Sequence, residues 1–268
     1  MSNTSLYEPI SLACVVPGIF PHVALYTETN GRHVLYKEES LPFTELDRDR
    51  LLNSKIDTLF VRSGDFAEVS SFAEENLPLI LKTCQDDNSA KCAALTQVTT
   101  TYLHTVFSDP EQAQDIKRCS ALTGHLAGYI AEYQNIADLI LTLGEASPFA
   151  VKHSMQVAVM SMLVWSKLFP EQQHDLIDIG VAGLLHDIGM ALILKDGLEE
   201  KEYWTTPNLD EIKRHPLEGY VFLRKSGQCN ELVLDAVRHH HERYFGGGYP
   251  GGLKGDEIRL STQVVGMS

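Results

Sequence analysis

The sequence predicts an α+β protein in which a small N-terminal α/β domain is followed by an all-α domain. Short runs of β-favouring residues occur within residues 11–62. From residue 147 onward, apolar residues recur at helical spacing until a glycine-rich loop at 246–252. A chain of 268 residues is long enough for a sizeable core and more than one folded unit.

The first domain is expected to span residues 1–85. Asn30-Gly31 lies between two of its β-favouring runs, and this dipeptide is a strong signal for a hairpin. Thr44 is placed to cap a short helix, and residues 65–85 read as a second helix. The β-favouring runs themselves are 12–16, 23–26, 33–36 and 58–61.

Two further regions follow. Residues 86–146 have long helical patterns with few breakers and are expected to form a connecting region, through which two chains could pair as a homodimer. Residues 147–268 are expected to form the second domain.

Composition limits the classes of partner. The net charge of −14, from 22 basic and 36 acidic residues, argues against binding to polymeric nucleic acid or an anionic membrane. It does not exclude a small phosphate ligand, because a bound metal ion can dominate the local charge. Five cysteines without paired spacing indicate reduced thiols and a cytoplasmic location. No signal-peptide pattern and no uninterrupted apolar run of about 18 residues are found, so no membrane span is expected.

His186 and Asp187 stand out within residues 176–194, where Asp178 is the only other ionisable residue. A segment that is apolar all round is a buried helix. Burying a carboxylate beside an imidazole costs several kcal/mol unless the charge is compensated, so such groups are usually paired or bind metal. The alternative is a mutually satisfied pair, or an aspartate that meets a distant arginine.

Three consecutive histidines, His239, His240 and His241, end an apolar helical segment. Neighbouring residues of a helix point about 100° apart, so His240 and His241 can serve two different metal ions. His239 is the extra member and is expected to be solvated. A basic helix end would account for one histidine but accounts for three poorly.

Two single histidines are ambiguous alone. His153 shares a predicted helical face with Val157, Met160 and Val164, which is typical of a buried core histidine. His215 precedes a proline suited to a first helical turn, which is typical of a surface cap residue. The glycine-rich loop at 246–252 can wrap a ligand, present a surface to a partner, or simply reverse the chain.

Taken together, these motifs resemble the HD-GYP family, a subset of the HD phosphohydrolases, over roughly residues 147–268. The resemblance implies an all-α domain around a metal centre, usually of iron or manganese, that hydrolyses cyclic di-GMP. Asp187 would bridge two metal ions, and His186 and Asp187 would be catalytic. The implied metal ligands are His153, His186, Asp187, His215, His240 and His241. The implied loop for substrate or a protein partner, such as a GGDEF domain, contains Arg243, Gly248, Tyr249 and Pro250.

The chain departs from the family pattern at three positions. Met190 replaces a lysine that would help to hold the scissile phosphate. Phe149 replaces a glutamate that ligates the third metal ion in some members, which favours two ions here. Phe245 replaces an aspartate before the loop glycines. The chain also stops at Ser268, where the family has a further aspartate ligand, and we therefore expect it to be a fragment truncated at its C-terminus.

Two functions stay open from the sequence. The first is a metal-dependent phosphodiesterase that hydrolyses cyclic di-GMP, or a related cyclic dinucleotide such as cyclic GMP-AMP, by a metal-activated hydroxide. The second is a weak or inactive domain that binds a cyclic dinucleotide or a protein and signals without turnover. Met190 and Phe245 favour the second, whereas retention of six ligands favours the first. Hydrolysis of mononucleotides is disfavoured by the loop.

Overall fold

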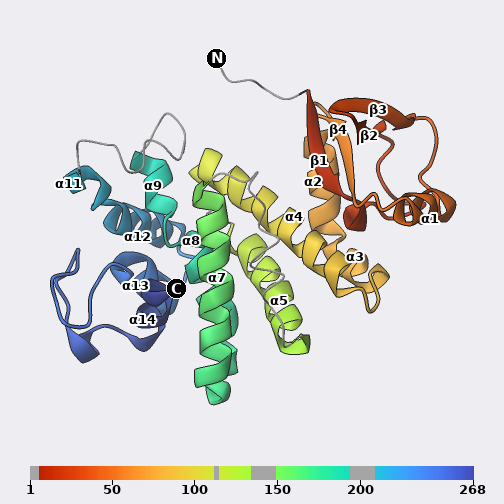
Figure 1. The fold of residues 1–268 in the computed structure, drawn as a ribbon. Helices are drawn as coiled ribbons and strands as arrows, with labels where there is room; N and C mark the ends of the chain where they lie inside the picture. Colours follow the sequence, from red (N-terminus) through yellow and green to blue (C-terminus); the bar gives the residue numbers. More distant parts are fainter. Residues whose placement is uncertain (1–5, 112–114, 134–148, 194–208) are drawn as a thin grey trace. The chain divides into compact units, whose positions relative to one another are not determined.

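The computed structural model describes residues 6–111, 115–133, 149–193 and 209–268 (Figure 1). The chain is mostly helical with one small four-stranded antiparallel sheet, as an α+β class requires. It divides into two compact units, Met1–Val98 and Thr99–Ser268. That division lies within helix α4 (Asn88–Ser108), whereas the sequence places its first boundary at residue 85. The three-part division of the chain stays a prediction, and part of its connecting region lies outside the described residues.

The sheet of the first unit has the strand order β1-β4-β2-β3, and all of its pairs are antiparallel. Its strands are β1 (Tyr7–Ser11), β2 (Leu25–Thr29), β3 (Arg32–Lys37) and β4 (Thr58–Arg62). The expected strand at 12–16 is wrong, because β1 ends at Ser11 and Leu12–Cys14 is a short 3₁₀ helix. The Ser11 side chain caps that helix, and all three of its residues are buried. An apolar run buried on every side has no period that separates a strand from a helix.

The hairpin prediction is confirmed. Asn30 and Gly31 connect β2 to β3, and their φ angles are 52° and 72°. Positive φ at both central residues is what a tight two-residue hairpin turn requires, and asparagine and glycine adopt it at least cost.

The helices of the first unit also follow from local chemistry. Thr44 caps α1 (Glu45–Asn53) in a capping box with Asp47, as expected for this threonine. The single helix expected over 65–85 is two helices, α2 (Phe66–Glu75) and α3 (Leu77–Thr83), separated at Asn76. The core of this unit joins strand and helix side chains, including Ile10, Leu25, Leu51, Leu59 and Val69.

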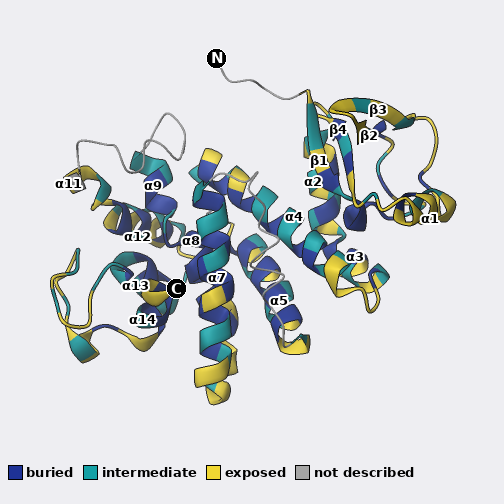
Figure 2. Ribbon diagram, in the orientation of Figure 1, coloured by how far each residue is buried: buried dark blue, intermediate teal, exposed yellow. Residues whose placement is uncertain are grey.

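The second unit is helical over its described residues. Helix α8 (Leu176–Leu185) contacts α5, α7 and α13, and eight of its ten residues are buried. Figure 2 shows α7, in contrast, with both buried and exposed surface. The other helices are α5 (Ile116–Glu132), α7 (Phe149–Leu168), η3 (Pro170–Asp175), α9 (Ile188–Ile193), α11 (Leu209–Ile212), α12 (His215–Ser226), α13 (Glu231–His239), η4 (Gly255–Glu257) and α14 (Leu260–Met267).

The apolar segment around α8 also meets a test for membrane spans. Among the described residues, Pro170–Ile193 is long and apolar enough to cross a membrane by length and composition, with a mean hydropathy of 1.8. Within its most apolar 18 residues, 67% are buried inside the protein, as in the core helix of a soluble domain. One segment of this kind is a weak indication of a membrane span. The expectation that the chain has no membrane span stays a prediction.

Candidate metal centre

The first part of the site is a break in the buried segment at the centre of the second unit. Helix α8 ends at Leu185, His186 and Asp187 form a turn, and α9 begins at Ile188. The side chains of His186 and Asp187 are only 4% and 14% exposed. The sequence therefore buries an imidazole beside a carboxylate, and their compensation must come from neighbouring helices.

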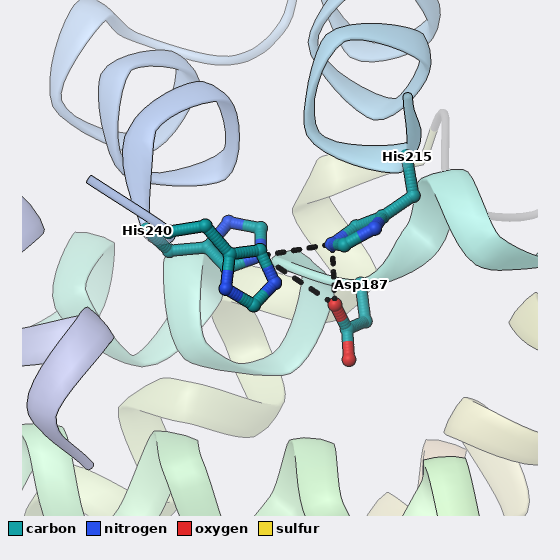
Figure 3. A group of neighbouring side chains, drawn as sticks. Asp187, His215 and His240 are labelled. Carbon is teal, nitrogen blue, oxygen red and sulfur yellow. Dashed lines mark hydrogen bonds and ion pairs between the residues drawn. The ribbon is translucent and has the colours of Figure 1, made fainter. Parts of the chain in front are cut away.

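The two oxygens of the Asp187 carboxylate face two different pairs of histidines. Asp187 Oδ2 lies 3.3 Å from His186 Nε2 and 3.7 Å from His153 Nε2. Asp187 Oδ1 lies 3.1 Å from His215 Nε2 and 3.5 Å from His240 Nε2, and this second group is drawn in Figure 3. One carboxylate thus stands between histidines that come from four different segments of the chain.

Backbone carbonyls fix the orientation of three of these rings. The Nδ1 atom of His186 lies 2.9 Å from the carbonyl oxygen of Gly183. The Nδ1 atoms of His215 and His240 lie 2.7 and 2.8 Å from the carbonyls of Ile212 and Val237. Because a carbonyl only accepts hydrogen bonds, each Nδ1 must donate, and this leaves Nε2 of each ring facing Asp187.

The distances between these rings fit a shared cation. His186 Nε2 lies 3.2 Å from His153 Nε2, and His215 Nε2 lies 3.1 Å from His240 Nε2. In the second pair both Nδ1 atoms donate to carbonyls, so two neutral rings would bring Nε2 lone pairs face to face, and these cannot form a hydrogen bond. Two imidazole nitrogens on one first-row metal ion, each about 2.1 Å from it, lie roughly 3 Å apart. The donor set therefore fits a metal ion better than it fits a self-contained histidine cluster.

All six residues proposed as ligands meet here, in two groups that share Asp187. In each group the candidate ligand atoms lie within 4.8 Å of one another. We call them the first half-site (His153, His186 and Asp187) and the second half-site (Asp187, His215, His240 and His241). The sequence around His215 is typical of a surface cap residue. In the structure this histidine is instead buried, with 3% of its surface exposed.

The surroundings set the charge states that ligation needs. Burial lowers the pKa of His240 to about 4 and that of His241 to about 3. Burial and the nearby His186 also lower the pKa of His153. Burial opposes ionisation of Asp187, but its histidine neighbours outweigh this and hold its pKa well below the usual range. At neutral pH, His153, His240 and His241 are therefore neutral imidazoles beside an ionised carboxylate, the forms that bind metal.

His186 differs from its neighbours. Burial disfavours its charged form, but attraction and hydrogen bonding to Asp187 outweigh that effect and raise its pKa. A proton on His186 competes with a cation for the same Nε2 position, so binding of a metal ion at the first half-site would release it.

The glycine-rich loop lies beside the second half-site. The Tyr249 ring stacks on His241, with centroids 4.7 Å apart and planes 21° apart. Gly248 packs against the backbone of residues 241–243, where a Cβ atom would lie 2.5 Å from the Arg243 nitrogen. Arg243 and Pro250 are exposed. Of the four loop residues singled out from the sequence, Tyr249 and Gly248 therefore touch the cluster region.

Glu242 directly follows the three histidines, and sequence reasoning did not reveal its structural role. Its side chain is fully buried, and its carboxylate accepts hydrogen bonds from the Gly251 and Leu253 amides at 2.5 and 3.0 Å. The expectation that His239 is solvated is wrong. Its side chain is 12% exposed and its Nδ1 lies 3.5 Å from Glu242, because the loop folds back over it.

The departures from the family pattern have definite positions. Phe149 stacks parallel to His153, with centroids 5.7 Å apart. Met190 is 2% exposed in α9, and Phe245 is 96% exposed on the loop. The predicted inward stripe of His153 is only partly correct, since Met160 is 36% exposed.

Comparison with known proteins agrees with this resemblance. Residues 150–266 match the model of the HD domain family. The chain is 31% identical over 154 residues to the cyclic di-GMP phosphodiesterase PA4108 of Pseudomonas aeruginosa, covering 57% of this chain and 37% of that protein. It is 39% identical over 94 residues to the cyclic di-GMP phosphodiesterase response regulator RpfG of Xanthomonas campestris, covering 34% of this chain and 24% of that protein.

A third relative acts on a different dinucleotide. The chain is 33% identical over 124 residues to the 3′3′-cGAMP-specific phosphodiesterase 3 of Vibrio cholerae, covering 44% of this chain and 25% of that protein. The chain thus spans about a third or less of the length of these three relatives. Among solved structures, Bd1817, an HDG"Y"P protein from Bdellovibrio bacteriovorus, has the same fold, with a TM-score of 0.67 at 18% identity over 97% of this chain and 85% of that one. Residues 150–266 thus match the HD domain family, and the chain is similar to HD-GYP proteins in the sequence of this region and in its fold.

Proposed function

We propose that this chain is a metal-dependent phosphodiesterase that hydrolyses cyclic di-GMP or a related cyclic dinucleotide, with His186 and Asp187 as catalytic residues. The observation that supports this most directly is the Asp187 carboxylate, whose two oxygens face separate pairs of histidines. Imidazoles around a shared carboxylate suit two divalent first-row metal ions, and iron or manganese is our proposal.

When bound, two such ions lower the pKa of a water molecule and stabilise charge on phosphoryl oxygens. The protein's own part is to hold the ligands in their binding forms. Asp187 stays ionised, and backbone carbonyls fix the rings of His186, His215 and His240 before any ion arrives. A preorganised ligand set avoids the cost of reorganisation on binding.

The loop supplies groups suited to an anionic substrate. Burial raises the pKa of Tyr249 to about 12, so its hydroxyl keeps its proton and can donate a hydrogen bond to a phosphate. Arg243 is exposed beside it and can pair with a phosphate or with an acidic partner protein, such as a GGDEF domain. The named activities of three relatives, on cyclic di-GMP and on 3′3′-cGAMP, support the substrate class. A cytoplasmic location and a homodimer belong to the same proposal.

A second candidate is a signalling domain that binds a cyclic dinucleotide or a protein without turnover. Met190 favours it, because a buried thioether stands where the family has a phosphate-holding lysine. The exposed Phe245 ring also suits a protein contact better than it suits chemistry.

The test is hydrolysis of cyclic di-GMP and of 3′3′-cGAMP by protein purified without oxygen, with bound metals counted in the same sample. We expect turnover and about two ions per chain in the parent. His186→Ala and Asp187→Ala should abolish turnover. His174→Ala is the matched control, because the His174 side chain is 74% exposed, and it should behave as the parent.

If the metal-loaded protein binds either dinucleotide but never cleaves it, the result would refute the phosphodiesterase and support the signalling domain that binds without turnover. Protein that keeps full turnover after Asp187→Ala would exclude the proposed site.

A further inference from the structure

Glycines pack directly against the backbone of the histidines in the second half-site. Gly266 of α14 lies against His240, and a Cβ atom there would stand 2.5 Å from the His240 carbonyl oxygen. Gly189 of α9 lies still closer to the His215 carbonyl oxygen and also faces the Gly219 amide. Each contact meets main chain, which cannot rotate out of the way as a side chain can.

The position of these main-chain atoms determines where the imidazoles point. His215 and His240 are each clamped between their own backbone and the carbonyl three residues earlier. A shift of that backbone is therefore transmitted to Nε2, the atom that faces Asp187. Close packing leaves little space in which such a shift can be absorbed.

The first half-site has its own glycine. A Cβ atom on Gly183 would overlap the backbone of Ala158, so this glycine lets α8 approach α7. The Gly183 carbonyl accepts the hydrogen bond from His186, and α7 contains His153. A side chain at position 183 would therefore separate the two histidines of the first half-site.

The other helical glycines differ in what they face. Gly180 of α8 meets the side chains of Met162 and Thr123, and Gly219 of α12 faces Gly189 itself. Gly128 of α5 has no atom within 4 Å of the position of a Cβ atom, and Gly124 has only an ordinary contact with Ile177. Glycine inside a helix is less favourable than alanine, so a glycine there needs a packing reason. Gly183, Gly189 and Gly266 have that reason, and in all three cases it involves a histidine of the cluster.

We infer that Gly183, Gly189 and Gly266 are positioning residues that set the separation of the metal-binding histidines, Gly183 in the first half-site and the other two in the second. The inference rests on the proposed function only in that the cluster binds metal; it does not require turnover.

The test starts with Gly266→Ala, because Gly266 is exposed and lies in the last turn of α14. Metal-free protein is titrated with Mn²⁺, and bound ions are counted while electron paramagnetic resonance distinguishes single ions from coupled pairs. We expect one of two ions to bind about 10- to 100-fold more weakly, with loss of the coupled signal. Gly189→Ala should do the same, and Gly128→Ala should titrate as the parent.

Double variants assign the affected half-site. Gly266→Ala combined with His241→Ala should bind Mn²⁺ no more weakly than His241→Ala alone, since both act on the second half-site. Gly266→Ala combined with His153→Ala should lose the ion of the first half-site and bind the remaining ion about 10- to 100-fold more weakly than His153→Ala alone. For Gly183→Ala we expect the reverse: no further weakening in the His153→Ala background, and further weakening in the His241→Ala background. Circular dichroism of the metal-free proteins checks that each variant is folded.

Parent-like Mn²⁺ binding by Gly266→Ala and Gly189→Ala would overturn the inference. So would unfolding of metal-free Gly266→Ala, which would give the glycine a role in the fold rather than in histidine position. A parent that binds two ions without hydrolysis would refute the enzyme and leave the inference intact, whereas a parent that binds none would overturn both.

Discussion

His215 and His240 face each other through their Nε2 atoms at 3.1 Å, although neither can donate a hydrogen bond to the other when Nδ1 holds the proton. The two residues are 25 positions apart, and separate helices bring them together. Such an arrangement is unfavourable for the bare protein and favourable around a cation. We therefore expect a metal ion to lie between these two nitrogen atoms.

Asp187 is shared by both half-sites, so its neutral analogue should affect both. We expect Asp187→Asn to reduce bound metal from about two ions per chain to none, because the carboxylate is a candidate ligand in each group. His153→Ala should instead remove about one ion. Metal analysis after dialysis against a weak chelator measures this. Equal losses from the two variants would contradict the sharing of Asp187.

Glu242 holds the loop closed, so its removal should loosen the loop. Glu242→Ala leaves the Gly251 and Leu253 amides without their acceptor, and we expect a loss of about 3 kcal/mol in the free energy of unfolding. Hydrogen exchange at those two amides should quicken. Glu257→Ala is the control, since its carboxylate accepts from an exposed amide, and it should cost well under half as much. Unchanged exchange in Glu242→Ala would show that other contacts hold the loop.

The hairpin turn should tolerate glycine and resist other residues. Gly31→Ala places a Cβ atom at a φ of 72° and should cost about 1 kcal/mol. Asn30→Gly should be nearly neutral, because asparagine already adopts a φ of 52° there. Thermal unfolding of the two variants measures the difference, and equal melting temperatures would be evidence against the turn geometry.

Asp47 should make stability depend on pH. Burial opposes its ionisation, but hydrogen bonds from Lys37 and Thr44 outweigh this and hold its pKa below the usual value. A carboxyl with a lower pKa in the folded state stabilises the fold above its unfolded pKa of about 3.9, and the contribution is lost as the pH falls through the folded pKa. We expect Asp47→Asn to cost about 1 kcal/mol at pH 7 and progressively less toward pH 3.

Urea unfolding across that pH range measures the effect of Asp47→Asn. The control is Asp49→Asn, at an exposed position on the same helix, which should change the free energy of unfolding little at pH 7 or at pH 3. A stability difference between parent and Asp47→Asn that does not change with pH would exclude the linkage.

The identity of the cluster could be predicted from sequence because its residue types are costly to bury without a partner. A histidine and an aspartate in an apolar segment, together with three histidines at a helix end, are hard to reconcile with ordinary core packing. The pairing could not be predicted. Which histidine faces which oxygen of Asp187 depends on how α7 and α13 pack against α8 and how α12 packs against α9. No local sequence pattern contains that information.

Two of the wrong predictions, those for His239 and for the run at 12–16, have a common cause. His239 looked solvated because its burial depends on a loop that folds back through Glu242, a stretch of chain without a helical or strand period. The run at 12–16 looked like a strand because composition alone cannot separate two kinds of buried segment. In both cases the tertiary environment decided an outcome on which local propensity was neutral.

The placement of one carboxylate between the two half-sites has a thermodynamic consequence. Ions that share Asp187 cannot bind independently, because the first occupant changes the charge that the second one meets. The resulting coupling free energy is reciprocal: whatever the first ion does to the affinity for the second, the second does to the affinity for the first. A titration of this protein with one metal should therefore depart from two independent binding isotherms.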